Sequence, residues 1–155
     1  MPKAIEAFLN EHAVAYEVIH HRRDYTAQET AADTHTPGKT FAKTVLVYAD
    51  GRFYMTVLPA THQLDFEKLK TALGAKELRL ASEAEIEKLC PDCEVGGMPP
   101  FGNYYNLPVY VSHLLQNNSQ ITFNAGTHED VLRMSYTDFE DLVKPTVTDI
   151  TVDKG

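Results

Sequence analysis

The sequence contains little cysteine and no long apolar run. Cys90 and Cys93 are too few for the disulfide framework of a small secreted protein, so we expect a reducing compartment. No apolar stretch approaches the roughly 20 residues that span a bilayer. The first 13 residues alternate charged with apolar residues too closely for a signal peptide. We therefore expect a soluble, cytoplasmic protein that has no membrane partner.

Positive charge is also scarce, since 14 Lys and Arg face 22 Asp and Glu for a net charge of −8. Proteins that coat DNA or RNA need many cations against the phosphates, so the composition argues against that class and against a DNA partner. The net charge does not exclude a protein that binds the end of a single nucleic acid. Arg22, Arg23, Lys39 and Lys43 gather early in the chain, either as solvated surface or as contacts to such an end.

The length of 155 residues and a hydrophobic content of 43% suit one domain, residues 1–155, around one core. Helices are predicted where apolar residues recur at helical spacing behind a capping residue, and strands where β-branched and aromatic residues cluster. The expected helices are 3–13, 26–35, 66–73, 83–89 and a short one that opens at 137; the expected strands are 16–20, 42–49, 52–59, 109–112, 120–125 and 130–135.

Two features of the connections shape the expected fold. Asp50-Gly51 separates two strand-like runs and tolerates the positive φ angles of a tight hairpin turn. Residues 90–108 are rich in proline and glycine and lack periodicity, which predicts a long loop, and long loops are usually functional. Helices scattered among hairpin-connected strands favour an α+β fold over a doubly wound α/β sheet.

Three segments offer groups that could hold a ligand. Lys43 opens an apolar strand, either as an edge residue or as an ammonium aimed into a pocket. The loop from Gly96 to Gly102 combines glycines, which let a backbone approach a ligand, with stiffening prolines, yet a rigid structural loop has the same composition. The turn from Asn124 to His128 follows a strand, and His128 is either a surface residue or a proton-exchanging group.

Other reactive residues carry weaker signals. Cys90-Pro91-Asp92-Cys93 lacks two further zinc ligands, and it follows a helix rather than opening one as redox pairs do, so we expect both thiols to pack beneath the loop. Ser112 and His113 are strand neighbours that point to opposite faces and cannot form a triad.

Taken together, these segments resemble the YbaK/prolyl-tRNA synthetase-associated domain family, whose members are editing deacylases. The similarity covers most of the chain and rests on the order and spacing of several motifs. They are Thr26-Ala27-Gln28-Glu29-Thr30-Ala31, Ala42-Lys43-Thr44-Val45-Leu46-Val47, Leu64-Asp65-Phe66-Glu67-Lys68-Leu69, Gly74-Ala75-Lys76, Gly96-Gly97-Met98-Pro99-Pro100-Phe101-Gly102, Leu107-Pro108-Val109-Tyr110-Val111 and Phe123-Asn124-Ala125-Gly126-Thr127-His128.

The resemblance implies a mixed, mainly antiparallel sheet curled into a partial barrel with flanking helices. It implies hydrolysis, in trans, of the ester of a small mischarged amino acid (Ala, Ser, Thr or Cys) on tRNA, with proline tRNA expected. The terminal ribose assists, so no nucleophile, metal or cofactor is required. The implied catalytic residues are Lys43, Gly96, Pro100 and His128; the implied substrate-binding residues are Thr44, Gly97, Met98, Pro99, Phe101, Gly102, Asn124, Ala125, Gly126 and Thr127; the candidate tRNA contacts are Arg22, Arg23 and Lys39.

The chain departs from the family pattern at two places. Ser112-His113 stands where members often carry Asp, and Thr44 stands where alanine-directed relatives carry Asn, which leaves the edited amino acid open. A noncatalytic module that binds tRNA or a synthetase, with the same fold, is the alternative. The expected partners are the acceptor end of aminoacyl-tRNA and an aminoacyl-tRNA synthetase.

Overall fold

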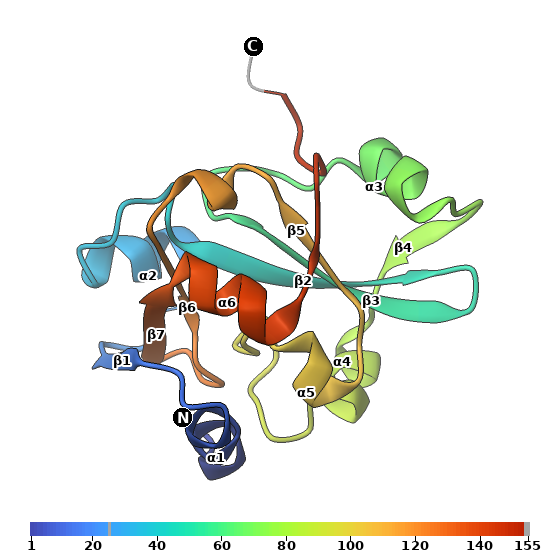
Figure 1. Ribbon diagram of the computed structural model, residues 1–155. Helices are drawn as coiled ribbons and strands as arrows, with labels where there is room; N and C mark the ends of the chain where they lie inside the picture. Colours follow the sequence, from blue (N-terminus) through green and yellow to red (C-terminus); the bar gives the residue numbers. More distant parts are fainter. Residues whose placement is uncertain (25, 154–155) are drawn as a thin grey trace.

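The computed structural model of the protein describes residues 1–24 and 26–153 (Figure 1). Its helices are α1 (Lys3–Glu11), α2 (Ala27–Asp33), α3 (Phe66–Leu73), α4 (Glu83–Leu89), α5 (Gly102–Tyr105), the 3-10 helix η1 (Leu115–Asn117) and α6 (Tyr136–Val143). Its strands are β1 (Tyr16–His20), β2 (Ala42–Ala49), β3 (Arg52–Pro59), β4 (Leu78–Leu80), β5 (Val109–Ser112), β6 (Gln120–Asn124), β7 (Asp130–Ser135) and β8 (Thr146–Thr148).

The strands form two sheets that meet at one backbone bridge. The larger sheet has the order β4-β2-β3-β5-β8, and the smaller one has the order β1-β7-β6. Only β3–β5 and β5–β8 pair in parallel; the other pairs are antiparallel. Phe41, just before β2, bridges Thr122 of β6, which links the sheets into one curved layer. The pairings in residues 1–24 and 26–153 do not close this layer into a barrel, so the predicted α+β fold with a mainly antiparallel, partly rolled sheet is confirmed.

The β2–β3 hairpin is the longest pairing in the larger sheet and is confirmed as predicted. Asp50 and Gly51 adopt φ angles of 47° and 89°, the left-handed values that its tight turn needs. The Asp50 carboxylate also accepts hydrogen bonds from the amides of Lys76 and Glu77, at 2.9 and 3.0 Å. In Figure 1 the turn lies at one end of the hairpin, beside β4, and α2 lies near the other end.

Three helices begin where the capping residues Thr26, Asp65 and Ser82 predict, but α1 and α2 end at Glu11 and Asp33, two residues before the expected ends. Thr26 and Ser82 form complete capping boxes, and Asp65 caps α3, which ends at the left-handed Gly74. The helix expected to open at 137 instead begins at Tyr136, because the Ser135 hydroxyl accepts the amide hydrogen of Asp138 and serves as its N-cap.

Four short elements in the described residues were not predicted: α5, η1, β4 and β8. α5 interrupts the loop expected over residues 90–108, and β4 and β8 each contain three residues. β8 joins the sheet only through parallel pairing with β5. Strands this short show too few residues to reveal an alternating pattern.

Alternation along β2 assigns its side chains to two faces. Ala42 and Leu46 belong to the largest hydrophobic cluster, together with Phe101 and Phe123. Val47 faces the other way, into a cluster with Leu69 of α3. We call the first face inner and the second face outer, and the distinction decides which residues can share a site.

Candidate functional site

The loop before α5 and the turn after β6 are held together by backbone hydrogen bonds. The Glu94 amide donates to the Gly126 carbonyl at 2.9 Å, and the Gly126 amide donates to the Gly97 carbonyl at 2.7 Å. Gly96 and Gly126 have φ angles of 84° and 98°, which other residues adopt only with strain. The structure thus brings together two of the three segments that the sequence singled out.

Close approach explains why glycine stands at position 97. A Cβ atom there would lie 3.1 Å from the carbonyl carbon and 3.2 Å from the amide nitrogen of Thr127. Backbone atoms cannot move aside as a flexible side chain can, so the loop and the turn fit only without this Cβ. Peptide groups of the two segments therefore lie side by side, where a ligand could contact both.

The rest of the loop turns into the protein interior. Met98 and Phe101 are 3% and 0% exposed and belong to the inner-face cluster, and Pro99, Pro100 and Gly102 are buried as well. Ala125 is also 0% exposed and lies in the same cluster. Pro100 was predicted to be catalytic and the others to bind substrate; in the structure all of them are buried, and Met98, Phe101 and Ala125 belong to the core cluster. Gly96 is exposed, so its backbone is accessible from solvent.

His128 anchors the loop. Its Nε2 lies 2.8 Å from the carbonyl oxygen of Val95, and since a carbonyl only accepts, Nε2 carries the proton. The His128 amide donates to the Glu94 carboxylate at 2.8 Å. The imidazole also lies against Gly96, where an added Cβ would come 3.3 Å from Cε1. His128 therefore positions the loop, a role that spacing in the sequence does not reveal.

Glu94 extends this anchor to the segment after β1. Arg23 donates to its two carboxylate oxygens at 3.3 and 2.6 Å, which lowers the pKa of Glu94. Arg22 donates instead to Asp33 at 2.6 Å. Both arginines were candidates either for solvated surface or for tRNA contact, and in the structure both bind carboxylates of this chain. Glu94 was missed because an isolated glutamate in a loop carries no sequence signal.

Asn124, at the end of β6, faces the same region. Its side-chain amide donates to the Gly96 carbonyl at 3.3 Å. Its Oδ1 is buried and has no hydrogen-bond partner within residues 1–24 and 26–153. A buried acceptor without a donor costs free energy, so this oxygen suits a donor that a ligand brings. Thr127 stiffens the same turn, since its hydroxyl accepts the amide hydrogens of Glu129 and Asp130.

Lys43 projects from the outer face of β2. The bridge between Phe41 and Thr122 is parallel, so Lys43 and Asn124, each two residues further, project to the same side. Lys43 is half-buried, burial lowers the pKa of its ammonium, and the described residues give it no hydrogen bond or ion pair. An ammonium held partly out of water without a partner is unusual for a surface edge residue and suits a ligand site.

A buried apolar cluster includes Phe41, two residues before Lys43 on the same face of the strand. Its other buried members are Ala31 of α2, Ala60 and Val131. The Gln28 side chain of α2 donates to the Ala60 carbonyl at 3.4 Å, which fastens the helix to this cluster. The helix that contains Gln28 was predicted from the sequence, but Gln28 was not predicted as a site residue.

The two departures from the family pattern have structural explanations. Thr44 pairs with Val57, which lies in the inner-face cluster, so Thr44 faces away from Lys43. Any influence of Thr44 on selectivity must pass through the strand. Ser112 is fully buried and its hydroxyl accepts the Leu114 amide hydrogen at 3.2 Å, while His113 is exposed on the other side.

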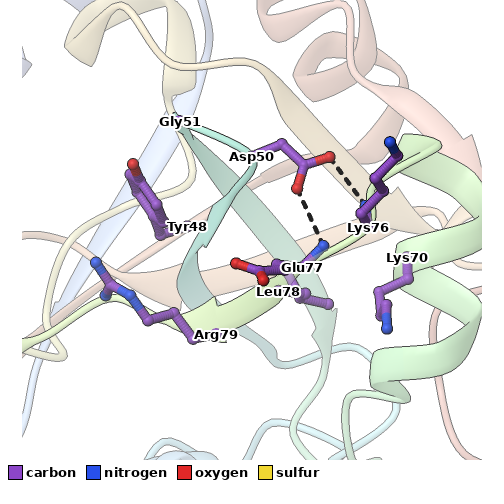
Figure 2. Close-up of a pocket in the computed structure, with 8 residues that line it drawn as sticks. All are labelled: Tyr48, Asp50, Gly51, Lys70, Lys76, Glu77, Leu78 and Arg79. Atoms are coloured by element: carbon purple, nitrogen blue, oxygen red, sulfur yellow. Dashed lines mark hydrogen bonds between the residues drawn. The ribbon is translucent and has the colours of Figure 1, made fainter.

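The largest of the measured cavities lies elsewhere. Its volume is about 520 Å³, and Figure 2 shows its walls at the turn end of the β2–β3 hairpin. There the Asp50 carboxylate accepts the Glu77 amide hydrogen, and the Arg79 guanidinium lies over the Tyr48 ring, 4.4 Å from its centroid. Lys43, Gly96 and His128 do not line it. We place the candidate site by its convergent polar groups and not by hollow volume.

Cysteine and metal chemistry find little support. Burial raises the pKa of Cys90 and Cys93 to about 12, which disfavours the thiolate that redox or metal chemistry needs. His21, Asp24 and Asp33 offer ligand atoms within 4.8 Å of one another. The guanidinium of Arg22 already supplies a cation there, 2.6 Å from Asp33 and 3.5 Å from Asp24. In the described part of the chain, no helix has the length and apolarity to cross a membrane.

The environment of Lys43 predicts a gain in stability when its charge is removed. Burial lowers the pKa of Lys43, so the folded state binds this proton more weakly than the unfolded state does, and the ammonium destabilises the fold below its ordinary pKa of about 10.4. Lys43→Met should therefore raise the melting temperature at pH 7, and the gain should shrink as the pH rises through the lysine range.

Lys68→Met provides the matched control. Lys68 donates to Asp149 and Asp153 at 3.0 and 2.8 Å, and these bonds raise its pKa, so its removal should lower the melting temperature. Thermal unfolding of both variants checks the pair. A lower melting temperature for Lys43→Met would mean that the ammonium has a stabilising partner.

Comparison with known proteins assigns the family. Residues 21–142 match the aminoacyl-tRNA editing domain. The chain is 35% identical over 101 residues to the proline–tRNA ligase of Leptospira biflexa, covering 65% of this chain and 17% of the ligase. It is 31% identical over 106 residues to that of Staphylococcus saprophyticus, covering 68% and 18%. It is 29% identical over 92 residues to the multifunctional Ser/Thr-tRNA deacylase ProXp-y of Escherichia coli K12, covering 59% and 54%.

These relatives differ from the chain in extent. The chain spans less than a fifth of the two ligases and about half of the deacylase. A crystal structure described as a candidate trans-editing enzyme for prolyl-tRNA synthetase has the same fold, with a TM-score of 0.86 at 21% identity over 97% of this chain and 96% of that one. Because the family model covers far more than half of its residues, the protein belongs to the aminoacyl-tRNA editing domain family.

Proposed function

We propose that the protein is an aminoacyl-tRNA deacylase that acts in trans on a small mischarged amino acid, Ala, Ser, Thr or Cys, carried by proline tRNA. The observation that carries this proposal is the half-buried Lys43, which has no hydrogen bond or ion pair within the described residues and shares the outer face with Asn124. Membership of the editing family and the names of the relatives, proline–tRNA ligases and a Ser/Thr-tRNA deacylase, agree with it.

The proposed reaction breaks the ester between the amino acid and the terminal ribose. Lys43 donates a hydrogen bond to the ester carbonyl oxygen, on which negative charge grows as water adds to the carbonyl carbon. The bond from that carbon to the ribose oxygen then breaks. A proton from the water goes to the ribose oxygen, directly or through the neighbouring ribose hydroxyl. The products are the free amino acid and deacylated tRNA.

The other site groups position the substrate. Asn124 Oδ1, buried and without a donor in the described residues, suits the ammonium of the aminoacyl group. The backbone of Gly96 and Gly97, fixed by His128, borders the reacting ester. Orientation of this kind can supply much of the rate enhancement without a covalent intermediate. The raised pKa values of both thiols agree with a mechanism that uses no cysteine nucleophile.

A panel of mischarged tRNAs tests the proposal. Alanyl, seryl, threonyl and cysteinyl esters of proline tRNA, with correctly charged prolyl-tRNA beside them, are incubated with the protein, and the release of free amino acid is followed over time. We expect at least one small ester to be cleaved well above its spontaneous rate and the prolyl ester to be spared. Tight tRNA binding without faster hydrolysis of any ester would instead support the noncatalytic binding module.

A further inference from the structure

A polar cavity lies on the outer face of the smaller sheet, next to the candidate site. Its volume is about 290 Å³. Its walls come from the segment between α2 and β2, from the segment between η1 and β6, and from β6 and β7. The lining residues are His35, Thr36, Pro37, Thr40, Asn118, Ser119, Gln120, Thr122 and Arg133.

The cavity and the candidate site are neighbours along one strand. Thr122 lines the cavity, and Asn124 of the candidate site lies two residues further on the same face of β6. Two residues of a strand span about 6.8 Å. Stacked nucleotides advance about 3.4 Å each along one strand, so this separation corresponds to about two nucleotides.

Arg133 is the positive charge of the cavity, and its guanidinium is fixed in place. Nε donates to the Thr122 hydroxyl at 3.2 Å, and Nη2 donates to the Thr36 hydroxyl at 2.9 Å. Nη1 contacts Glu17 at 3.3 Å, but Glu17 is 62% exposed, so this ion pair is screened by water. Two neutral partners hold the guanidinium in one orientation, and its exposed ion pair with Glu17 compensates its charge only weakly.

The rim of the cavity is rigid as well. The Asn118 side chain donates to the Lys39 carbonyl at 3.2 Å, and the Thr40 hydroxyl donates to the Pro37 carbonyl at 2.9 Å. Among the described residues that line the cavity there is no Phe, Tyr or Trp, so these residues offer no stacking platform for a base. A fixed guanidinium among hydroxyl and amide groups is suited to a phosphate.

We propose that this cavity binds a phosphodiester of the single-stranded acceptor end, within about two nucleotides of the one that carries the amino acid. The inference rests on the proposed function, because it uses the ester at Lys43 and Asn124 to fix the direction of the RNA. The cavity gives a net acidic protein one local contact for its polyanionic substrate. It adds affinity without taking part in bond breaking.

The sharpest test adds one negative charge without changing shape. Gln120 lines the cavity, is exposed, and makes no side-chain hydrogen bond within the described residues. Gln120→Glu therefore places a carboxylate in the cavity on a side chain of the same size and shape. We expect the KM for aminoacyl-tRNA to rise about tenfold with kcat nearly unchanged, the pattern of lost ground-state binding. Gln63→Glu, on the exposed segment whose carbonyl accepts the Val152 amide, adds the same charge outside the cavity and should change neither constant.

A second variant removes the proposed phosphate ligand. Arg133→Gln should raise the KM and reduce the slope of log affinity against log salt by about one unit, because one phosphate contact is lost. Circular dichroism and the melting temperature show whether each variant is folded. Equal effects of the two glutamate variants, a change in kcat alone, or an unchanged salt slope would overturn the proposal.

Binding of deacylated tRNA, measured by fluorescence anisotropy, separates this inference from the function on which it rests. If the wild-type protein cleaves no ester but Gln120→Glu still weakens tRNA binding relative to Gln63→Glu, the deacylase proposal fails and the phosphate site stands. If esters are cleaved and the two variants bind tRNA equally, the phosphate site fails and the deacylase proposal stands.

Discussion

Lys43→Ala should lower kcat for deacylation by about 10²- to 10³-fold, the usual cost of removing one preorganised donor from a developing oxyanion. Lys43 is the one group on the outer face of β2 that offers a charged donor beside Asn124 among residues 1–24 and 26–153. Since the ammonium acts mainly on the transition state, kcat should fall more than KM rises. Single-turnover hydrolysis of a mischarged tRNA at saturating protein measures this directly.

The control for this result removes a lysine from another site. Lys76 lies at the far end of the β2–β3 hairpin, beside the cavity at Asp50 (Figure 2), and its side chain is exposed. Lys76→Ala should keep the wild-type kcat. If Lys43→Ala also keeps it while remaining folded, Lys43 is no oxyanion donor and the proposed mechanism is wrong.

Gly102→Ala should lower the free energy of unfolding by about 2–3 kcal/mol, within the usual range for overpacking a filled core. Gly102 begins α5, and a Cβ there would overlap both a Val109 methyl group and the carbonyl oxygen of Leu107. The Leu107 amide donates to the Gly102 carbonyl at 2.7 Å, so the backbone cannot move away without breaking this bond. Urea unfolding, with the midpoint and slope compared to wild type, tests the value.

Gly74→Ala separates crowding from backbone strain. Gly74 has a φ angle of 64°, but its Cβ would meet no atom within 4 Å. Gly74→Ala should therefore cost only about 1 kcal/mol, the penalty of a left-handed residue with a side chain. Equal losses for the two variants would show that crowding at Gly102 is relieved by movement of α5.

Local rules accounted for much of the fold. The hairpin turn at Asp50-Gly51 and the capping boxes at Thr26 and Ser82 need only a few adjacent residues, and all three were predicted from the sequence. The parallel pairing of β5 with β3 and β8 was not predicted. It joins segments far apart in the chain, and three-residue β8 shows no period of its own.

In the candidate site too, features set by local sequence were predicted, and features set by tertiary contacts were not. Motif spacing indicated Lys43, the Gly96 loop and the Asn124 turn, but it could not show which side chains turn inward. Phe101 and Met98 fill the core, and Arg23 and Glu94 bind each other across 71 residues. Such pairings depend on tertiary contacts that leave no pattern in one sequence. The opposite faces of Lys43 and Thr44, by contrast, follow from strand alternation alone.

The hydrogen bonds between residues 94–97 and Gly126 also bear on how the protein is made. The loop is synthesised about 30 residues before the turn that fixes it, and β6 and β7, which carry that turn, belong to the last third of the chain. During translation the Gly96 segment therefore has nothing to hold it. A chain that stops before β6 contains Lys43 and the loop but lacks the Gly126 turn that orders the loop. A prematurely released fragment of this length should therefore lack the proposed deacylase activity.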